Sequence, residues 1–489
     1  MEYQPTIGFE IHAELKTRTK MFCDSPNDPL ENHPNINVCP VCMGHPGTLP
    51  VINKEAVKKV LLTGLALGGK VSQYSRFERK NYFYPDLPKG YQISQYQHPL
   101  VLGGEMTLPS SGKKIRITRI HLEEDTGRLV HDAGGFDARS ERVSLVDFNR
   151  AGVPLMELVT QPDISSAEEA GDFAEEFRLV LRYLNVSEAD MEKGQLRLEA
   201  NVSLNMGTKV ELKNINSFSA LRRAIEYEIK RQEKLLKAGK IVCHETRGWD
   251  DNGQRTVLQR SKEESHDYRY FPEPDLPPVK PYEDEELNPE KLKSELPELP
   301  WQKRLRFIKE YNLRPEESAM LISDKNLSDF FEKTISELLE WVSSKNKARA
   351  VGTALNYLTS DLQGLVKEKE LNWDELLVNP ENFAELVKMI NENSVSSRAA
   401  KDILRIMVEE GGDPSEIAQS RGLKQIGDES QLENSVKKVL EENPKAVADF
   451  KKGKLQSLQF LIGQIMRETK GAANPEVIRS LLTKIIERV

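Results

Sequence analysis

The pattern of apolar and polar positions changes its period near residue 290. Before that point, apolar and polar residues alternate in segments such as 7–15, 114–122 and 196–204, and helical patterns lie between these segments. Alternation with a period of two is typical of strands that bury one face. From residue 301 onward, helical spacing dominates and β-rich runs disappear. The pattern therefore predicts a large mixed α and β domain, followed by an all-helical region.

Two helices are predicted within the first part. Ser166 and Glu169 have the spacing of a capping box, and the apolar residues after them fall on one helical face. A second helix is predicted to begin at about Ser217. Residues 64–71, GLALGGKV, match a phosphate loop except at Val71, but the preceding residues have helical spacing, whereas a phosphate loop follows a strand. We therefore interpret Gly68 and Gly69 as the end of a helix.

Proline and glycine mark the predicted domain boundaries. Residues 283–300, EDEELNPEKLKSELPELP, are acidic and proline-rich, which is typical of a linker and predicts a boundary near residue 290. Residues 411–414, GGDP, interrupt the helical part, and the last helix is predicted to begin at Asn474 and Pro475. We expect three domains, at 1–290, 291–410 and 411–489.

Composition narrows the class of protein. Charged residues make up 30% of the 489 residues, and the sequence contains no apolar run of membrane-spanning length and no N-terminal signal pattern. We expect a cytoplasmic protein. The formal net charge of −8 argues against a protein that coats nucleic acid, because such binding depends on neutralising phosphates. Any contact with RNA is expected to be local.

Three of the four cysteines lie close together in the sequence. Cys39 and Cys42 form a CxxC pair, Cys23 precedes them, and Cys243 is far away. This usage is not a disulfide framework and suits a reducing compartment. A structural zinc site requires four ligands, so Asp24 or His33 would have to complete the set. An ordinary loop without metal explains the cluster equally well, and both interpretations stay open.

Polar residues of one strand and one loop are candidates for chemistry. Glu10, His12 and Glu14 alternate in a predicted strand and share a face, which suits a metal or acid–base site but is also typical of a solvated strand. Residues 79–95, RKNYFYPDLPKGYQISQ, contain two Xaa-Pro steps that hold the chain in a loop. The cations of this loop, at Arg79, Lys80 and Lys89, suit an anionic ligand.

Residues 79–95, together with IGFEIHAEL at 7–15 and HLEEDTG at 121–127, closely resemble the GatB family, whose members are the B subunits of the aspartyl/glutamyl-tRNA(Asn/Gln) amidotransferase. The resemblance extends over nearly the whole chain. It implies an α+β fold with a mainly antiparallel cradle domain at 1–290, which carries the kinase and transamidase activities. A helical domain at 291–410 and a small helical YqeY-like tail at 411–489 would follow.

The resemblance also implies the reaction. A family member would act as a carbon–nitrogen ligase: ATP phosphorylates the side-chain carboxylate of Glu-tRNA(Gln), of Asp-tRNA(Asn) or of both, and ammonia then displaces phosphate. The chain has no amidase signature of its own, so an amidase, which is the A subunit of the complex and is bound with a small C subunit, would supply the ammonia. A scaffold that only binds tRNA is the main alternative. The related archaeal GatE proteins are disfavoured, because the segment after Gly194 has no room for their inserted domain.

Site residues are carried over by matching motifs. The resemblance implies that Glu10, His12, Glu124 and Glu157 hold Mg²⁺, which prefers oxygen ligands, while the histidine leaves Mn²⁺ open. Glu10, His12 and Glu124 would also be catalytic, and Lys80 matches a residue at the ammonia tunnel. Neighbouring acids cannot be separated by sequence. Any of three nearby carboxylates could therefore replace one of these ligands, namely Glu123, Asp125 and Asp147.

Segments 194–201, GQLRLEAN, and 211–216, ELKNIN, resemble family segments that line a nucleotide pocket, although without the resemblance a polar sheet face would explain them. Leu198 and Glu199 stand where the family usually has Cys-Asp. Clustered basic residues in the helical part, such as Arg398, Lys401 and Arg405, are candidates for tRNA contacts or solvated faces. The predicted ATP-binding residues are Arg79, Arg197, Lys213, Asn201 and Asn214.

Overall fold

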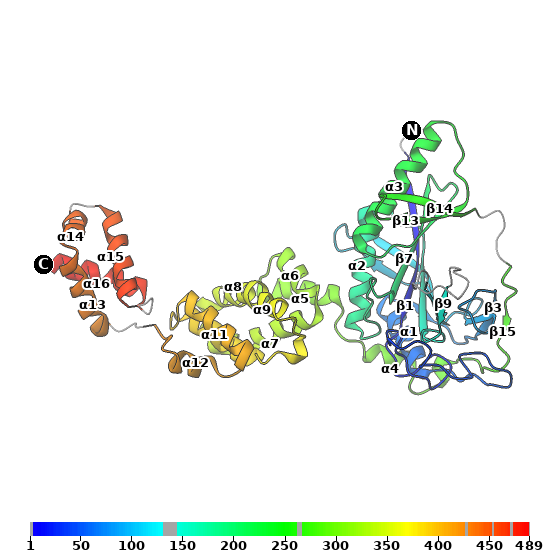
Figure 1. Cartoon of the computed structure of the whole chain (residues 1–489), viewed down its shortest axis with the longest axis horizontal. Coiled ribbons are helices and arrows are strands. Elements are labelled where there is room, and N and C mark those ends of the chain that lie inside the picture. Colours follow the sequence, from blue (N-terminus) through cyan, green and yellow to red (C-terminus); the bar gives the residue numbers. More distant parts are fainter. Residues whose placement is uncertain are drawn as a thin grey trace, which may run out of the picture. The chain divides into compact units, whose positions relative to one another are not determined.

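The computed structural model describes residues 3–130, 144–261, 267–425, 429–451, 454–469 and 473–488. Contacts divide the chain into two compact units, Met1–Lys303 and Arg304–Val489, which are shown in Figure 1 and described separately below. None of the helices in the described ranges combines the length and the apolar character that a membrane crossing requires.

The first unit is built on a ten-stranded mixed sheet. Its pairings are antiparallel except for the parallel pair of β12 and β13, so the predicted mainly antiparallel α+β fold is confirmed. The strand order is β14 (Arg255–Ser261), β13 (Glu245–Asp250), β12 (Val210–Lys213), β11 (Leu196–Leu204), β1 (Pro5–Glu14), β10 (Pro154–Thr160), β7 (Lys114–Glu124), β5 (Val101–Leu102) and β2 (Lys70–Val71), with β6 (Glu105–Thr107) also on β7.

Two smaller sheets accompany the large one. The three-stranded sheet has the order β15 (Phe271–Pro272), β3 (Glu78–Asn81) and β4 (Tyr91–Ser94), so it contains both ends of the loop predicted from residues 79–95. Its strands β3 and β15 lie beside each other in Figure 1 although they are far apart in the sequence. The two-stranded sheet pairs β8 (Arg128–Val130) with β9 (Leu145–Asp147).

Helices cover the apolar face of the large sheet. Helices α2 (Ala167–Tyr183) and α3 (Phe218–Lys237) pack against each other, and their buried residues share one core with β1 and β11. The predicted cap of α2 is present, since Ser166 Oγ accepts from Glu169 N at 3.1 Å. Glu169 Oε2 accepts from the backbone N–H of Ser165, one residue before the position that a standard capping box uses.

Helix α1 (Lys54–Ala66) ends where the sequence predicts. Its last turn is followed by Gly68 with φ of +71°, a left-handed conformation that glycine adopts without steric cost. The interpretation of residues 64–71 as a helix end, and not as a phosphate loop, is confirmed.

The acidic segment after residue 281 is ordered and belongs to the first unit. It contains a 3₁₀ turn (Pro281–Glu283) and helix α4 (Pro289–Ser294), which packs against α1. Leu287, Leu292 and Leu299 are buried there, and this explains why the segment does not behave as a linker. The first unit ends at Lys303, inside helix α5 (Pro300–Tyr311), whereas the first domain boundary was predicted near residue 290.

In the described part of the second unit, every regular element is a helix, as predicted. Buried residues of α7 and α10 form much of its interior, and α12 packs against α10 and α11. The helices are α6 (Pro315–Ile322), α7 (Lys325–Trp341), α8 (Lys347–Asn356), a π-helix (Tyr357–Leu362), α9 (Gln363–Glu368), α10 (Pro380–Asn391), α11 (Ser397–Glu410), α12 (Pro414–Ser420), α13 (Glu429–Glu442), α14 (Pro444–Lys451), α15 (Leu455–Glu468) and α16 (Pro475–Arg488), with short 3₁₀ turns at Ser344–Asn346 and Trp373–Glu375.

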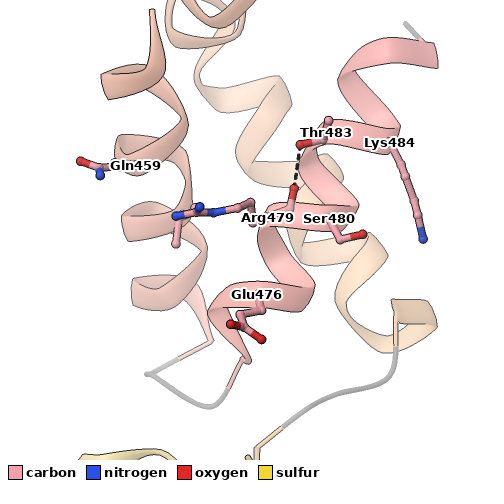
Figure 2. A pocket seen from close by; sticks show the side chains of 7 residues that line it. Gln459, Glu476, Arg479, Ser480, Thr483 and Lys484 are labelled. Carbon is pink, nitrogen blue, oxygen red and sulfur yellow. Dashed lines mark hydrogen bonds between the residues drawn. The ribbon is translucent and has the colours of Figure 1, made fainter.

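The last helices have a core of their own. Helix α16 begins at Pro475, as predicted, and its apolar face joins those of α13 and α15. Helix α12 follows residue 411 in the sequence but packs on α10 and α11, which precede it. The domain boundary at residue 411 stays a prediction. Figure 2 shows residues that line a surface hollow at α15 and α16, where the side chain of Arg479 extends from α16 toward α15. Its charged lining residues, Glu476, Arg479 and Lys484, are of mixed sign, and no acid–imidazole cluster lies there among the described residues.

Candidate functional site

Strand β1 presents two chemically different faces. Phe9, Ile11 and Ala13 are buried in the core beneath the sheet, where Phe9 contacts Phe173 of α2. Glu10 and His12 alternate with them and therefore emerge on the opposite face. The apolar half of the strand fixes its orientation, and the polar half is thereby directed to one side of the sheet.

The registers of the neighbouring strands gather further polar side chains on that side. On β11, Glu199 lies opposite Glu10, and on β10, Glu157 lies opposite His12. On β7, His121 lies opposite Glu157. Residues that lie opposite each other in antiparallel strands project to the same face. Four central strands thus contribute to one polar cluster.

This cluster lies in a cavity of about 590 Å³. Its wall combines acids, cations, two histidines and four tyrosines, from the large sheet, from β3 and β4, and from the segment before β15. The lining residues are Glu10, His12, Lys80, Tyr82, Gln92, Ser94, Tyr96, Arg119, His121, Glu123, Asp125, Thr126, Leu155, Glu157, Arg197, Glu199, Glu211, Lys213, Tyr268 and Tyr270.

Two groups of side chains in the cavity have the spacing of metal ligands. Ligand atoms of Glu10, His12 and Glu157 lie within 4.8 Å of one another, and the same holds for His121, Glu123 and Glu157. His12 Nε2 is 3.5 Å from Glu157 Oε2 and 3.6 Å from Glu123 Oε1. His121 Nδ1 and Glu123 Oε2 are buried without a hydrogen-bond partner. A divalent cation that prefers oxygen and accepts imidazole fits this donor set.

The acids and the histidine alter each other's charge. Burial would lower the pKa of His12, but the hydrogen bond and the negative charge of Glu157, together with Glu123 and Glu10, raise it to about 9. Burial and the charge of Glu157 raise the pKa of Glu10. Burial acts in the same sense on Glu157, yet His121 and His12 hold the pKa of Glu157 well below its usual value. The acids of the cluster therefore carry negative charge that a proton on His12 partly offsets.

Glu124, predicted as a ligand, lies outside this cluster. It follows Glu123 in β7, so it projects to the opposite face, where its carboxylate accepts from Lys89 Nζ and from the backbone N–H of Ile93. Glu123 occupies the cavity side, and so does Asp125, which pairs with Arg197 at 2.8 Å. Asp147, the remaining alternative, accepts from backbone N–H groups of Asn35 and Asn149 and does not line the cavity.

Three of the predicted cations line the cavity. Lys213 Nζ is 2.8 Å from Glu199 Oε1, and Arg197 pairs with Asp125. Lys80 Nζ lies 5.2 Å from the centre of the Tyr268 ring. Burial opposes the charged form of Lys80, but Glu123 and other negative groups raise its pKa above the ordinary value. All three side chains thus add positive charge beside the acidic cluster.

The other predicted nucleotide-binding residues do not line the cavity. Arg79 makes two hydrogen bonds with Glu273, and its guanidinium stacks over Tyr91 at 4.4 Å. Asn201 lies in β11 opposite Gly8 and Glu211, and Asn214 follows β12 with φ of +61°.

Sequence reasoning missed Arg119. Its guanidinium lies 5.0 Å from the Tyr96 ring and 3.6 Å from Glu157, and its Nε is buried without a hydrogen-bond partner. The alternation of Arg119, His121 and Glu123 in one strand was the available signal.

The cysteine cluster forms a second candidate metal centre. The sulfur atoms of Cys23, Cys39 and Cys42 lie within 4.8 Å of one another, and the fully buried Lys20 has its Nζ 3.9 Å from Cys42 Sγ. A hydrogen bond from Cys23, and the charge of Lys20, lower the pKa of Cys42 to about 5. These groups fit three of the four ligands of zinc.

Neither predicted fourth ligand joins the three sulfurs. Asp24 is exposed, and His33 is exposed with its ring 2.7 Å from Glu31. Ser25 is buried beside Cys23, whose thiol it contacts through hydrogen bonds.

Comparisons with known proteins cover almost the whole chain. A family model described as the GatB/GatE catalytic domain matches residues 5–286, and one described as the GatB domain matches residues 322–486. Three relatives are named as the B subunit of aspartyl/glutamyl-tRNA(Asn/Gln) amidotransferase. The protein of Thermotoga petrophila is 47% identical over the full length of both chains, and that of Thermomicrobium roseum is 45% identical over 100% of this chain and 99% of the relative. That of Crocosphaera subtropica is 42% identical over 99% of this chain and 98% of the relative.

Both matched segments agree with the division of the molecule into a mixed sheet unit and a helical unit. The similarity to this relative covers the full length of the chain, so the compared region includes the strands that form the cavity. The chain therefore belongs to the GatB family.

Proposed function

We propose that this chain is the B subunit of a tRNA-dependent amidotransferase and converts Glu-tRNA(Gln), Asp-tRNA(Asn) or both into the amidated forms. The names of its full-length relatives support this assignment. The chemistry takes two steps, since a free carboxylate is a poor acceptor for ammonia. The side-chain carboxylate first attacks the terminal phosphorus of ATP, which gives an acyl phosphate and ADP. Ammonia then attacks the acyl carbon, and inorganic phosphate leaves.

The observation that carries the proposal is the juxtaposition of metal-ligand groups and cations in one cavity. Glu10, His12 and Glu157, with Glu123 beside them, would hold Mg²⁺. When bound there, the ion would neutralise phosphate oxygens and orient them for transfer. Because phosphoryl transfer depends mainly on positioning and on charge stabilisation, a site of this composition suits it.

The cations of the cavity would bind the anionic reactants. Arg197 and Lys213 are held by Asp125 and Glu199, so their positive ends are fixed before a phosphate arrives. Arg119 has a buried N–H without a partner and would donate to an oxygen of the bound nucleotide or acyl group. Such preorganised donors stabilise developing negative charge without reorganisation.

Ammonia would be supplied by an amidase, the A subunit of the complex, which is bound with the small C subunit, because the sequence lacks an amidase signature. Lys80, which resembles a tunnel residue of the family, lies at the cavity beside Tyr82 and Tyr268. We expect Lys80→Ala to impair amidation with glutamine and to spare amidation with ammonium. Equal loss with the two nitrogen sources would count against a role in ammonia delivery.

A structural zinc ion is the second proposed metal. Cys23, Cys39 and Cys42 would hold it as thiolates, with the buried hydroxyl of Ser25 beside them. The positive charge of Lys20 would offset the net negative charge of a zinc ion with three thiolates.

The deciding experiment is ATP-dependent amidation of Glu-tRNA(Gln) by this chain co-expressed with its A and C subunits, with ammonium chloride as the nitrogen source. Glu10→Ala is the control variant. Gln-tRNA formed by the wild type and not by the variant supports activation in this cavity. Activity that survives Glu10→Ala would place the activation elsewhere. If neither the wild type nor Glu10→Ala forms Gln-tRNA while both still bind tRNA, a scaffold that only binds tRNA would be favoured.

A further inference from the structure

Arg79 was expected to bind phosphate, but the structure engages it with a distant segment of the same unit. Its Nε and Nη2 donate to the two carboxylate oxygens of Glu273 at 2.6 and 2.8 Å, and the Glu273 side chain is fully buried. Two parallel hydrogen bonds of this kind are the strongest arrangement available to an arginine–carboxylate pair. The guanidinium also stacks over Tyr91 and lies 5.7 Å from the Phe271 ring. Such an arginine is not available to a ligand.

The pair anchors residues 268–273, which we call the aromatic strap, along strand β3. Phe271 of β15 lies opposite Arg79, and Glu273 N donates to Phe77 O at 2.9 Å. At the other end, Asn81 N donates to Tyr268 O at 2.9 Å, and Asn81 Nδ2 donates to Arg269 O at 2.9 Å. Figure 1 shows β15 beside β3. The strap is thus held at both ends by main-chain bonds and closed by one buried ion pair.

The strap supplies the aromatic side of the cavity. Tyr268 and Tyr270 both line it, and the ring of Tyr270 stacks on Tyr96 at 4.7 Å with an interplanar angle of 11°. Tyr268 contacts Lys80 through its ring face, while Arg119 lies over Tyr96. The rings on this side of the cavity thus contact two of its cations, Lys80 and Arg119.

We propose that Arg79 and Glu273 are positioning residues that hold the aromatic strap closed, so that the strap excludes water from the activated acyl group. This inference rests on the proposed function. An acyl phosphate has two competing fates. Attack by ammonia gives the amide and phosphate, whereas attack by water returns the carboxylate and releases phosphate, with ATP spent and no amide formed. A wall that excludes water favours the first fate.

The test measures how many phosphates are released for each amide formed by the heterotrimer with ammonium chloride at saturation. The variants are Arg79→Met and Glu273→Gln, the second of which keeps the shape of the side chain. The wild type is expected to release close to one phosphate per amide. Loss of the charge-assisted bonds raises the open fraction of the strap by about tenfold, and the ratio should increase in both variants.

Arg116→Met is the matched control. Arg116 makes an equally short bidentate pair with Asp163, at 2.8 and 2.6 Å, but neither residue lines the cavity. This variant loses an ion pair from the same unit and is expected to keep the wild-type ratio. A rise in the control as large as in Arg79→Met would mean general destabilisation and would overturn the inference.

Hydrogen exchange supplies a readout that does not depend on the reaction. The amides of Asn81 and Glu273 bond across the strap, and Arg79→Met should accelerate their exchange by about tenfold relative to Arg116→Met. Tyr270→Ala should raise the phosphate ratio as well, and adding Arg79→Met to it should then have little further effect, because the two changes act through one wall.

The outcomes separate the two hypotheses. Faster exchange of the strap amides with an unchanged phosphate ratio would overturn the water-excluding role, and unchanged exchange would overturn the anchoring role. If the wild-type heterotrimer cleaves no ATP in response to aminoacyl-tRNA, the proposed function fails. The exchange comparison then decides alone whether the pair holds the strap.

Discussion

At the scale of single residues, adjacent acids in one strand have opposite surroundings. Glu123 projects into the cavity with one carboxylate oxygen lacking a partner, whereas Glu124 is engaged by Lys89 on the other face. The alternation of β1 was sufficient to predict that Glu10 and His12 share a face. It could not tell Glu123 from Glu124, because that depends on the register of β7 against β10, where His121 lies opposite Glu157.

The two acids are expected to respond differently to the same substitution. Glu123→Gln should weaken the binding of Mn²⁺, used as a paramagnetic substitute for Mg²⁺, by ~10–100-fold, with little change in thermal stability. Glu124→Gln should destabilise the first unit by roughly 3 kcal/mol, since it leaves Lys89 buried without its counter-ion. Electron paramagnetic resonance titration and thermal melting of both variants check this. Equal effects on Mn²⁺ affinity would contradict the assignment.

Ser25 is the residue on which the zinc proposal can be tested. Ser25→Cys would bring a fourth thiol to Cys23, Cys39 and Cys42, and a four-thiolate set is a closed zinc site. We expect the variant to retain zinc longer than the wild type during dialysis against a chelator, measured as zinc per chain. If the wild type takes up no zinc when one equivalent is supplied, the three sulfurs are not a zinc site.

At the scale of elements, strands and helices with a clear period were predicted well. Strands β1, β7 and β11, the cap of α2, and the beginning of α16 all lie where the pattern placed them. The acidic segment around α4 was predicted less well. Its proline and charge content is typical of a linker, but three well-spaced leucines bury it against the first unit. The partner of Arg79 could not be predicted from the sequence either, because Glu273 is remote in sequence and the pairing of β3 with β15 depends on the tertiary fold.

The start of α2 is expected to depend on pH. Burial opposes ionisation of Glu169, but hydrogen bonds from Lys113 and from Ser165 lower its pKa below 4.5. A carboxyl group with a lowered pKa stabilises the fold above its ordinary pKa, and this stabilisation is lost as the pH falls through the lowered value. Glu169→Gln should therefore cost about 1 kcal/mol at pH 7, and the cost should decrease below pH 4.5 and vanish once the pH lies below the lowered pKa of Glu169.

Hydrogen exchange of the first-turn amides of α2, measured in the wild type and in Glu169→Gln at several pH values, checks this prediction. Substitution of Glu168, which is largely exposed at the same helix start, is the control. A cost that stays constant between neutral and acidic pH would mean that the charge of Glu169 contributes nothing to the cap.

At the scale of the whole molecule, the candidate metal-binding groups and the basic groups considered for tRNA binding lie mainly in different units. The acid–imidazole groups and the cysteine cluster are in Met1–Lys303, whereas the basic groups considered for tRNA lie mainly in Arg304–Val489. Several of these basic side chains are paired within the protein, as Lys401 is with Asp361 and Arg405 with Glu368. A further predicted basic cluster comprises Lys451, Lys452 and Lys454, of which Lys452 lies outside the described residues.

Helix α11 allows a comparison of two basic residues that differ in pairing. Arg398 is exposed, while Lys401, one turn later, has its Nζ 2.7 Å from Asp361. If α11 contacts the tRNA backbone, Arg398→Ala should weaken tRNA binding and lower the salt dependence of the affinity by about one unit of slope. Lys401→Ala should have the smaller effect. Filter binding at several salt concentrations measures both, and identical slopes for the two variants and the wild type would exclude α11 from the tRNA contact.

The crowding of acids in the cavity suits the proposed reaction but lowers the thermal stability of the metal-free protein. Glu10, Glu123, Glu157 and Glu199 are held near one another by strands whose other faces form the core, so the fold itself sustains their mutual repulsion. Burial and the charge of Glu157 raise the pKa of Glu10, so Glu10→Gln should raise the melting temperature of the metal-free protein while removing the ability to activate a carboxylate. Selection for heat resistance alone would then erode this cavity, and its persistence requires continuous selection for the reaction.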